Sequence, residues 1–129
     1  MNTDVIEVFG ADKNLTYSDG DLVGICNDGL VRPLEYGCVV NYIGVVTSFD
    51  ASSSEVSVLL VGKKECCVKV NSRDLTTLIG KKVLAIKGEN AFVVWDNIFD
   101  VDKKYDGIIL GGIYETARSG VVKATVLLK

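Results

Sequence analysis

Short apolar runs rich in β-branched residues recur along the whole chain, and clusters of Gly, Asp, Asn and Ser separate them. This pattern is typical of β-strands joined by tight turns. Apolar and polar residues alternate in 56–59 and 122–126, as in strands with one buried face. The sequence therefore predicts an all-β protein. The predicted strands are Val5–Phe9, Leu22–Cys26, Leu30–Pro33, Cys38–Tyr42, Gly44–Phe49, Val56–Val61, Cys66–Val70, Val83–Lys87, Ala91–Trp95, Ile108–Ile113 and Val121–Leu128.

One segment has helical spacing. Ser72 can cap a helix at its start. Leu75, Leu78 and Ile79 would fall on one side of that helix. The sequence therefore predicts at most one short helix, near residues 72–79, of one or two turns.

The chain has the pattern of a tandem duplication. Residues 13–23 align without a gap to residues 73–83, at an offset of 60. The offset then grows to 63 at residues 107–109 and to 68 at residues 126–128, where the second copy has longer loops. Loops tolerate insertions, so an unchanged order with a growing offset favours two similar β-repeats.

The two predicted repeats are residues 1–62 and 63–129. Each has about 60 residues, a length at which an isolated β-core is marginal. We therefore expect the repeats to share one core, as a compact barrel or sandwich. Strands at the ends of each repeat would leave edges that natural proteins cover or pair with another chain.

Composition adds a reason to expect assembly. The chain has 129 residues, of which 48% are hydrophobic, and its mean hydropathy of +0.30 is high for a soluble domain. Such a chain gains from burying more surface against copies of itself or another protein. The net charge of −3 argues against a nucleic-acid partner, which would need a concentrated basic surface.

The four cysteines form no C-x-x-C pair, and the chain has no histidine. Both facts argue against a zinc site. We interpret the cysteines as small buried hydrophobic residues in a reducing compartment. They are Cys26, Cys38, Cys66 and Cys67.

The sequence gives no reason to expect a membrane location. The first residues lack the basic and apolar regions of a signal peptide. The longest uncharged run, Tyr36–Phe49, is too short to span a bilayer. We expect an intracellular or virion protein.

Motifs for catalysis or cofactor binding are missing from the sequence. The glycines of 106–112 lack the order of a nucleotide-binding loop, and the serines of 52–54 have no neighbouring base. The acidic segment 96–106 lacks the glycine and the terminal glutamate of a calcium loop. We therefore expect no catalytic residue, no metal, no cofactor and no enzymatic activity.

Four aromatic residues crowd one segment: Phe92, Trp95, Phe99 and Tyr105. Packing in the core is the first interpretation. Because Trp and Phe beside a loop also suit an interface anchor, Trp95 and Phe99 are candidates for contact with a partner.

Three segments of the second repeat follow a recognisable layout: a strand ending in Trp-Asp (91–96), an Asp-Gly-x-x-x-Gly strand (106–111) and a closing strand (121–128). The first repeat has a similar order of elements. This layout resembles the capsid decoration proteins of tailed bacteriophages, which include the lambda-type head-stabilising and head-fibre-like proteins.

The resemblance implies an all-β protein, often trimeric, that binds the outer surface of a mature capsid. It implies the major capsid protein and copies of this chain as partners, and a virion protein made in the host cytoplasm. In that family an extended N-terminal segment adds to a capsid strand, although this chain lacks the Ala/Thr/Pro-rich arm of the lambda-type protein. The predicted interface residues are Val5, Ile6, Val8, Phe9, Trp95 and Phe99.

Two alternatives stay open. One is a cytosolic β-barrel that binds a small molecule or peptide, in which Trp95, Phe99 and Tyr105 would line a pocket. The other is an adaptor of a phage tail or baseplate. Capsid binding predicts a stable oligomer that co-sediments with phage heads, whereas a binding module predicts a monomer with a concave aromatic pocket.

Overall fold

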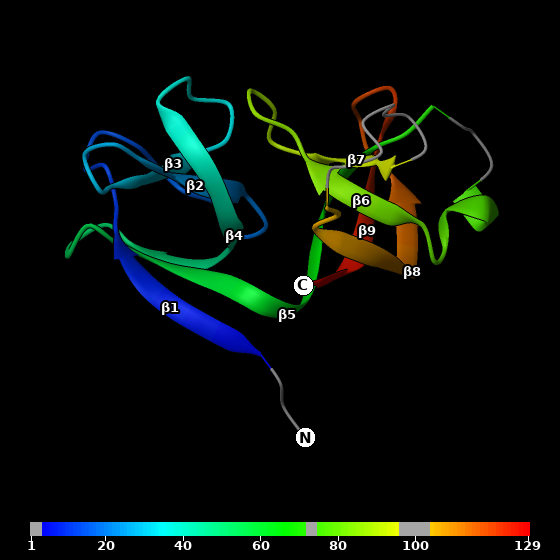
Figure 1. Ribbon diagram of the computed structural model, residues 1–129, viewed down its shortest axis with the longest axis horizontal. Coiled ribbons are helices and arrows are strands. Elements are labelled where there is room, and N and C mark those ends of the chain that lie inside the picture. The colour runs from blue at the N-terminus through cyan, green and yellow to red at the C-terminus, as the bar shows by residue number, and fades with distance from the viewer. Residues whose placement is uncertain (1–3, 72–74, 96–103) are drawn as a thin grey trace.

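A computed structural model describes residues 4–71, 75–95 and 104–129 of the chain (Figure 1). Strands dominate, and the helical content of these residues is limited to 3₁₀ conformation, so the all-β prediction is confirmed. The elements are β1 (Val5–Gly10), β2 (Leu22–Cys26), β3 (Val31–Pro33), β4 (Val39–Asp50), β5 (Glu55–Lys69), η1 (Leu75–Leu78), β6 (Lys82–Ala85), β7 (Phe92–Val94), β8 (Gly107–Glu115) and β9 (Val121–Leu128).

The N-terminal half is a five-stranded barrel. Antiparallel pairs link β1 to β5, β5 to β4, β4 to β2 and β2 to β3. A single parallel bridge between Ala11 and Val31 joins the chain after β1 to β3 and completes the circle. Strand β1 itself, Val5–Gly10, pairs with β5 alone among the described strands.

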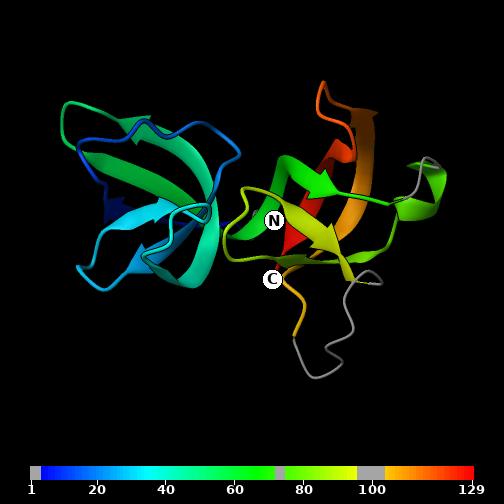
Figure 2. The same cartoon turned by 90° about the horizontal axis from the view of Figure 1, so that it is seen from above.

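The C-terminal half repeats this order of pairing. The second part of β5 pairs with β9, and the circle continues through β8, β6 and β7. It closes where β7 pairs in parallel with β5, at Val68–Phe92 and Lys69–Val93. Figures 1 and 2 show the two halves side by side.

The 15-residue strand β5 belongs to both halves. It pairs with β1 and β4 up to Val61, and with β9 from Gly62 onward. Gly62 has a φ of 140°, and a Cβ there would lie 2.3 Å from Asp4 Oδ1, so only glycine fits where the partners change. The prediction of two separate strands here is wrong, because the chain stays extended through this glycine.

A second pair of predicted strands is also continuous. The segment predicted as Cys38–Tyr42 and Gly44–Phe49 forms the single strand β4. Its register shifts against β2 next to Gly24 and Cys26, which lets the strand curve around the barrel without a break.

Backbone contacts recur at the offsets found in the sequence. Gly20 N donates to Val46 O at 2.9 Å, and Gly80 N donates to Ile109 O at 2.7 Å. Both glycines have positive φ values, 93° and 83°. The same turn therefore leads into β2 in the N-terminal half and into β6 in the C-terminal half, with its contacts at offsets of 60 and 63 residues.

The hydrophobic core has two parts. One cluster lies within the N-terminal half and includes Val23, Val46 and Val58. The larger cluster contains residues from both halves, with Leu22 and Val45 on one side and Phe92 and other second-half residues on the other. The halves thus pack against each other through apolar surface. The boundary between the two predicted repeats, at residues 62 and 63, stays a prediction from the sequence.

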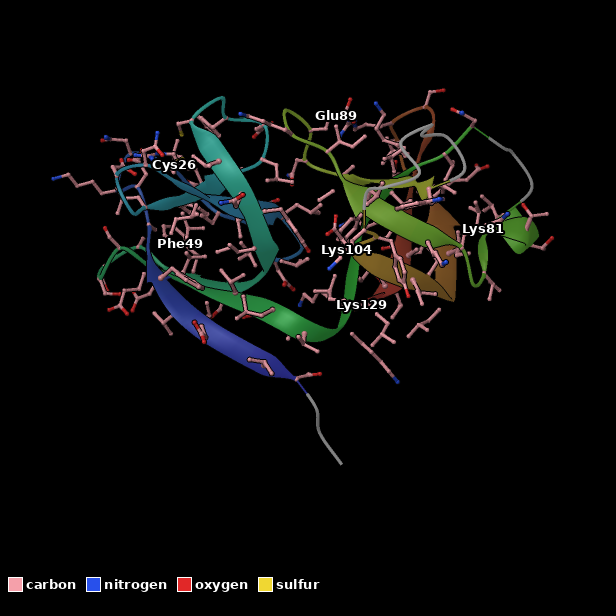
Figure 3. All side chains as sticks on the ribbon, in the orientation of Figure 1. Cys26, Phe49, Lys81, Glu89, Lys104 and Lys129 are labelled. Atoms are coloured by element: carbon pink, nitrogen blue, oxygen red, sulfur yellow. The ribbon has the colours of Figure 1, made fainter. Side chains whose placement is uncertain are left out.

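Polar groups also connect the halves. Asn90 Oδ1 accepts a hydrogen bond from Leu22 N at 2.8 Å, and Asn90 Nδ2 donates to Asp21 Oδ1 at 3.0 Å. Gly88 N donates to Leu34 O at 2.8 Å. Gly88, Glu89 and Asn90 belong to the turn between β6 and β7, and Figure 3 places Glu89 between the two halves. The β6–β7 turn therefore fixes the relative position of the halves.

The predicted helix near residues 72–79 is the 3₁₀ turn η1, Leu75–Leu78. Leu78 is buried in the larger cluster, and Leu75 packs against it. Ile79, expected on the same side, is 59% exposed. A tight 3₁₀ turn places side chains three residues apart on one side, which explains this difference. Ser72 lies outside the described residues.

Candidate functional site

Strand β1 carries an exposed apolar surface. Val5, Ile6 and Val8 are 44%, 52% and 58% exposed. Ile6 and Val8 point to the same face because side chains two residues apart do so in a strand. Val61, the partner of Val5 on β5, is also exposed and continues the apolar surface. We call Val5, Ile6, Val8 and Val61 the β1 surface.

The free edge of β1 lies beside this surface. Figure 1 shows β1 at the outside of the N-terminal half, with β5 along its inner side. Among the described strands none pairs with the outer edge of Val5–Gly10. Such an edge presents backbone N–H and C=O groups that can pair with another chain. Exposed apolar side chains next to it make this the region most suited to adding a strand.

The C-terminal end of β1 is held by contacts with the rest of the N-terminal half. Phe9 is half-buried and packs against the N-terminal cluster. Ala11 N donates to Ser54 O at 2.9 Å, and Ala11 bridges to Val31. Phe9 is thus a core residue at the end of the β1 surface, while Val5, Ile6 and Val8 present their side chains to solvent.

Trp95 belongs to a separate surface on the C-terminal half. It follows β7 directly and meets Tyr105 edge to face, with ring centroids 6.4 Å apart. Lys82 Nζ and Lys129 Nζ lie over the Tyr105 ring, at 4.8 and 3.9 Å from its centroid. A hydrogen bond with Lys129 lowers the pKa of Tyr105. The structure therefore brings two of the three predicted pocket aromatics together; Phe99 lies outside the described residues.

A polar cluster around Arg32 was missed by sequence reasoning. Arg32 Nε contacts Asp12 at 3.0 Å, and its Nη2 contacts Asp28 at 2.8 Å. The hydrogen bond with Arg32 lowers the pKa of Asp28 to about 2. Arg32 Nη1 also donates to Cys38 Sγ at 3.7 Å. Asp28 and Arg32 are four residues apart across the β2–β3 turn, whereas Asp12 and Cys38 come from other loops, so local spacing does not mark the whole group as neighbours.

The cysteine prediction is wrong in part. Cys26 and Cys66 are buried, as expected, whereas Cys38 is exposed and Cys67 is half-buried. Cys38 precedes β4 at the rim of an open depression, where no packing covers it. The expectation that all four act as buried hydrophobic residues therefore fails for Cys38.

Among the residues that the structure describes, no group of three or more acidic or cysteine side chains is placed to hold a metal ion. No helix in the same residues has both the length and the apolar character needed to cross a membrane. The expectations of no cofactor and no catalysis stay predictions.

The fold defines an all-β protein built of two five-stranded barrels that share one long strand. No family model and no curated protein matches the chain. The structure is similar to the crystal structure of the pre-mature bacteriophage phi29 gene product 12, with a TM-score of 0.64 and 15% sequence identity. The match covers 98% of this chain but 21% of that protein, so the chain spans about a fifth of its length. At this identity the similarity establishes the fold alone.

Proposed function

We propose that this protein is a structural, non-enzymatic component of a phage particle that docks through the β1 surface. The single observation that carries the proposal is an edge strand with three exposed apolar side chains, held at its C-terminal end. The similarity to a bacteriophage protein and the sequence resemblance to decoration proteins support the phage context.

The physical argument is strand addition. A partner strand laid along β1 would satisfy the free backbone groups of that edge, and Ile6 and Val8 would fill pockets on the partner. The polar residue between them, Glu7, points to the opposite face. Because both side chains are already nearly half buried, covering the rest of each contributes about 1–1.5 kcal/mol. A single such contact is weak, but many symmetric copies on one particle would bind strongly.

The partner we propose is the major capsid protein, with the chain attached to the outer surface of the capsid as a homotrimer. The support for this assignment is the decoration-protein layout of residues 91–96, 106–111 and 121–128. In the structure these segments supply β7, β8 and β9, which build the C-terminal barrel. That half would be free to contact neighbouring copies while β1 contacts the capsid.

A second candidate is a tail or baseplate adaptor. It is favoured by the match to 21% of a much longer phage chain, since the same pair of barrels then serves as one module among others. Both candidates use the β1 surface, and they differ in the partner.

The test is co-sedimentation with purified mature heads and, separately, purified tails of the phage that encodes the protein. We expect the parent chain to pellet with heads, and the Ile6→Asp/Val8→Asp variant to lose at least about tenfold in affinity, because two charges replace buried apolar contacts. The matched control is Ile79→Asp, an equally exposed residue away from β1, which should bind like the parent.

Binding to tails alone would favour the adaptor. Binding to neither, by a chain that light scattering shows to be a monomer, would contradict the proposal and favour the small-molecule or peptide module. Equal loss of binding in both variants would show that the β1 surface is not the docking site.

A further inference from the structure

Two thiols and a guanidinium meet in the N-terminal half. Cys26 ends β2 and pairs with Val39, so the chain neighbour Cys38 lies next to it. Arg32 Nη1 donates to Cys38 Sγ at 3.7 Å, and the Cys26 thiol interacts with both Cys38 and Arg32. All three residues line one open depression of about 450 Å³. Figure 3 labels Cys26 at this site.

We propose that Cys26 and Cys38 form a reversible disulfide by exchange with a small-molecule disulfide such as glutathione disulfide. Cys38 is exposed, and its sulfur accepts a hydrogen bond from Arg32 Nη1, so it is the thiol that a reagent in solvent reaches first. Cys26 is buried, interacts with the Cys38 thiol and serves as the resolving thiol. The open depression admits the reagent to Cys38.

The exchange has two steps. Cys38 releases its proton to solvent, and its thiolate attacks one sulfur of glutathione disulfide, which forms a mixed disulfide and expels one glutathione thiolate. Cys26 then releases its proton and attacks the Cys38 sulfur, expelling the second glutathione. The two cysteines lose two electrons together, and one glutathione disulfide is reduced to two glutathione molecules.

The other two cysteines serve as an internal comparison. Cys66 and Cys67 are adjacent on β5, so their side chains point to opposite faces. Cys66 has no exposed surface, and burial raises the pKa of its thiol to about 12, so a reagent in solvent does not reach it. Cys66 and Cys67 should therefore not form a disulfide with each other in the folded chain.

The experiment uses the full chain under native conditions. The protein is equilibrated with glutathione disulfide, free thiols are blocked with N-ethylmaleimide, and the chain is cut before Asp28, between the two cysteines. Mass spectrometry should find the Cys26 and Cys38 peptides linked in the parent and in the control Cys67→Ser. The link should be lost in both Cys26→Ser and Cys38→Ser.

Two results would overturn the proposal. One is a folded parent in which Cys38 carries glutathione while Cys26 carries maleimide. The other is a Cys26–Cys38 link that forms only in urea and never in the native chain. Because Cys38 is exposed, Cys38→Ser should fold, and circular dichroism of that variant checks this independently.

Discussion

At the scale of single residues, close backbone approach explains two glycines that the repeat pattern pairs. A Cβ at Gly44 would lie 2.2 Å from Leu59 O, and a Cβ at Gly107 would lie 2.9 Å from Leu127 O. These pairs match at the sequence offsets of 63 and 68 residues. Each glycine therefore lets two barrel strands approach at the same place in its half.

We predict that Gly44→Ala and Gly107→Ala each lower the free energy of unfolding by about 2 kcal/mol or more, since the added methyl group forces strands apart. Urea unfolding measures this change. Gly37→Ala is the matched control, because a Cβ there meets nothing within 4 Å, and it should change stability by less than about 0.5 kcal/mol. Similar losses at Gly37 and Gly44 would contradict the explanation.

Sequence reasoning was weakest at this scale. The contact of Cys26, Cys38 and Arg32 depends on a register shift in β4 and on the turn that brings β3 back along β2. The turn is predicted by the Asn-Asp-Gly run of residues 27–29, whereas the register shift in β4 has no local signature in the sequence. The exposure of Val5, Ile6 and Val8 agrees with the surface expected of them, while their role as an interface stays a prediction.

At the scale of elements, most strands could be predicted because apolar runs and turn residues alternate so regularly. The errors fall where a strand passes through a glycine. The predicted strands end at Val61 and begin again at Cys66, yet β5 continues through Gly62 because β9 and β7 replace β1 and β4 as its partners. Such a change of partners is a tertiary effect that no short window of sequence contains.

The β6–β7 turn gives the element-scale prediction. Asn90→Ala removes the acceptor for Leu22 N and the donor to Asp21, so we expect a loss of about 1–3 kcal/mol in unfolding free energy. Thermal unfolding by circular dichroism measures this loss. Asn41→Ala, an exposed change on β4, is the control and should have little effect. A neutral Asn90→Ala would show that the side-chain hydrogen bonds of Asn90 do not stabilise the contact between the halves.

At the scale of the whole molecule, the apolar residues of the chain are divided between the core and an exposed surface. The larger core cluster buries apolar residues from both halves and joins them. What it leaves exposed includes Val5, Ile6 and Val8 on the edge strand β1. We propose that these exposed side chains of β1 dock on a phage particle.

Docking through β1 can be tested by hydrogen exchange of the β1 backbone, measured for the free protein and for the protein bound to phage heads. We predict that the amides within residues 5–8 that face the free edge, which are every second one along β1, exchange much more slowly in the bound state, because an added strand accepts their hydrogen bonds. The amides that face β5 should change less, and the amides of β6 should stay unchanged. Bound protein whose β1 amides exchange as fast as in the free protein would contradict the account.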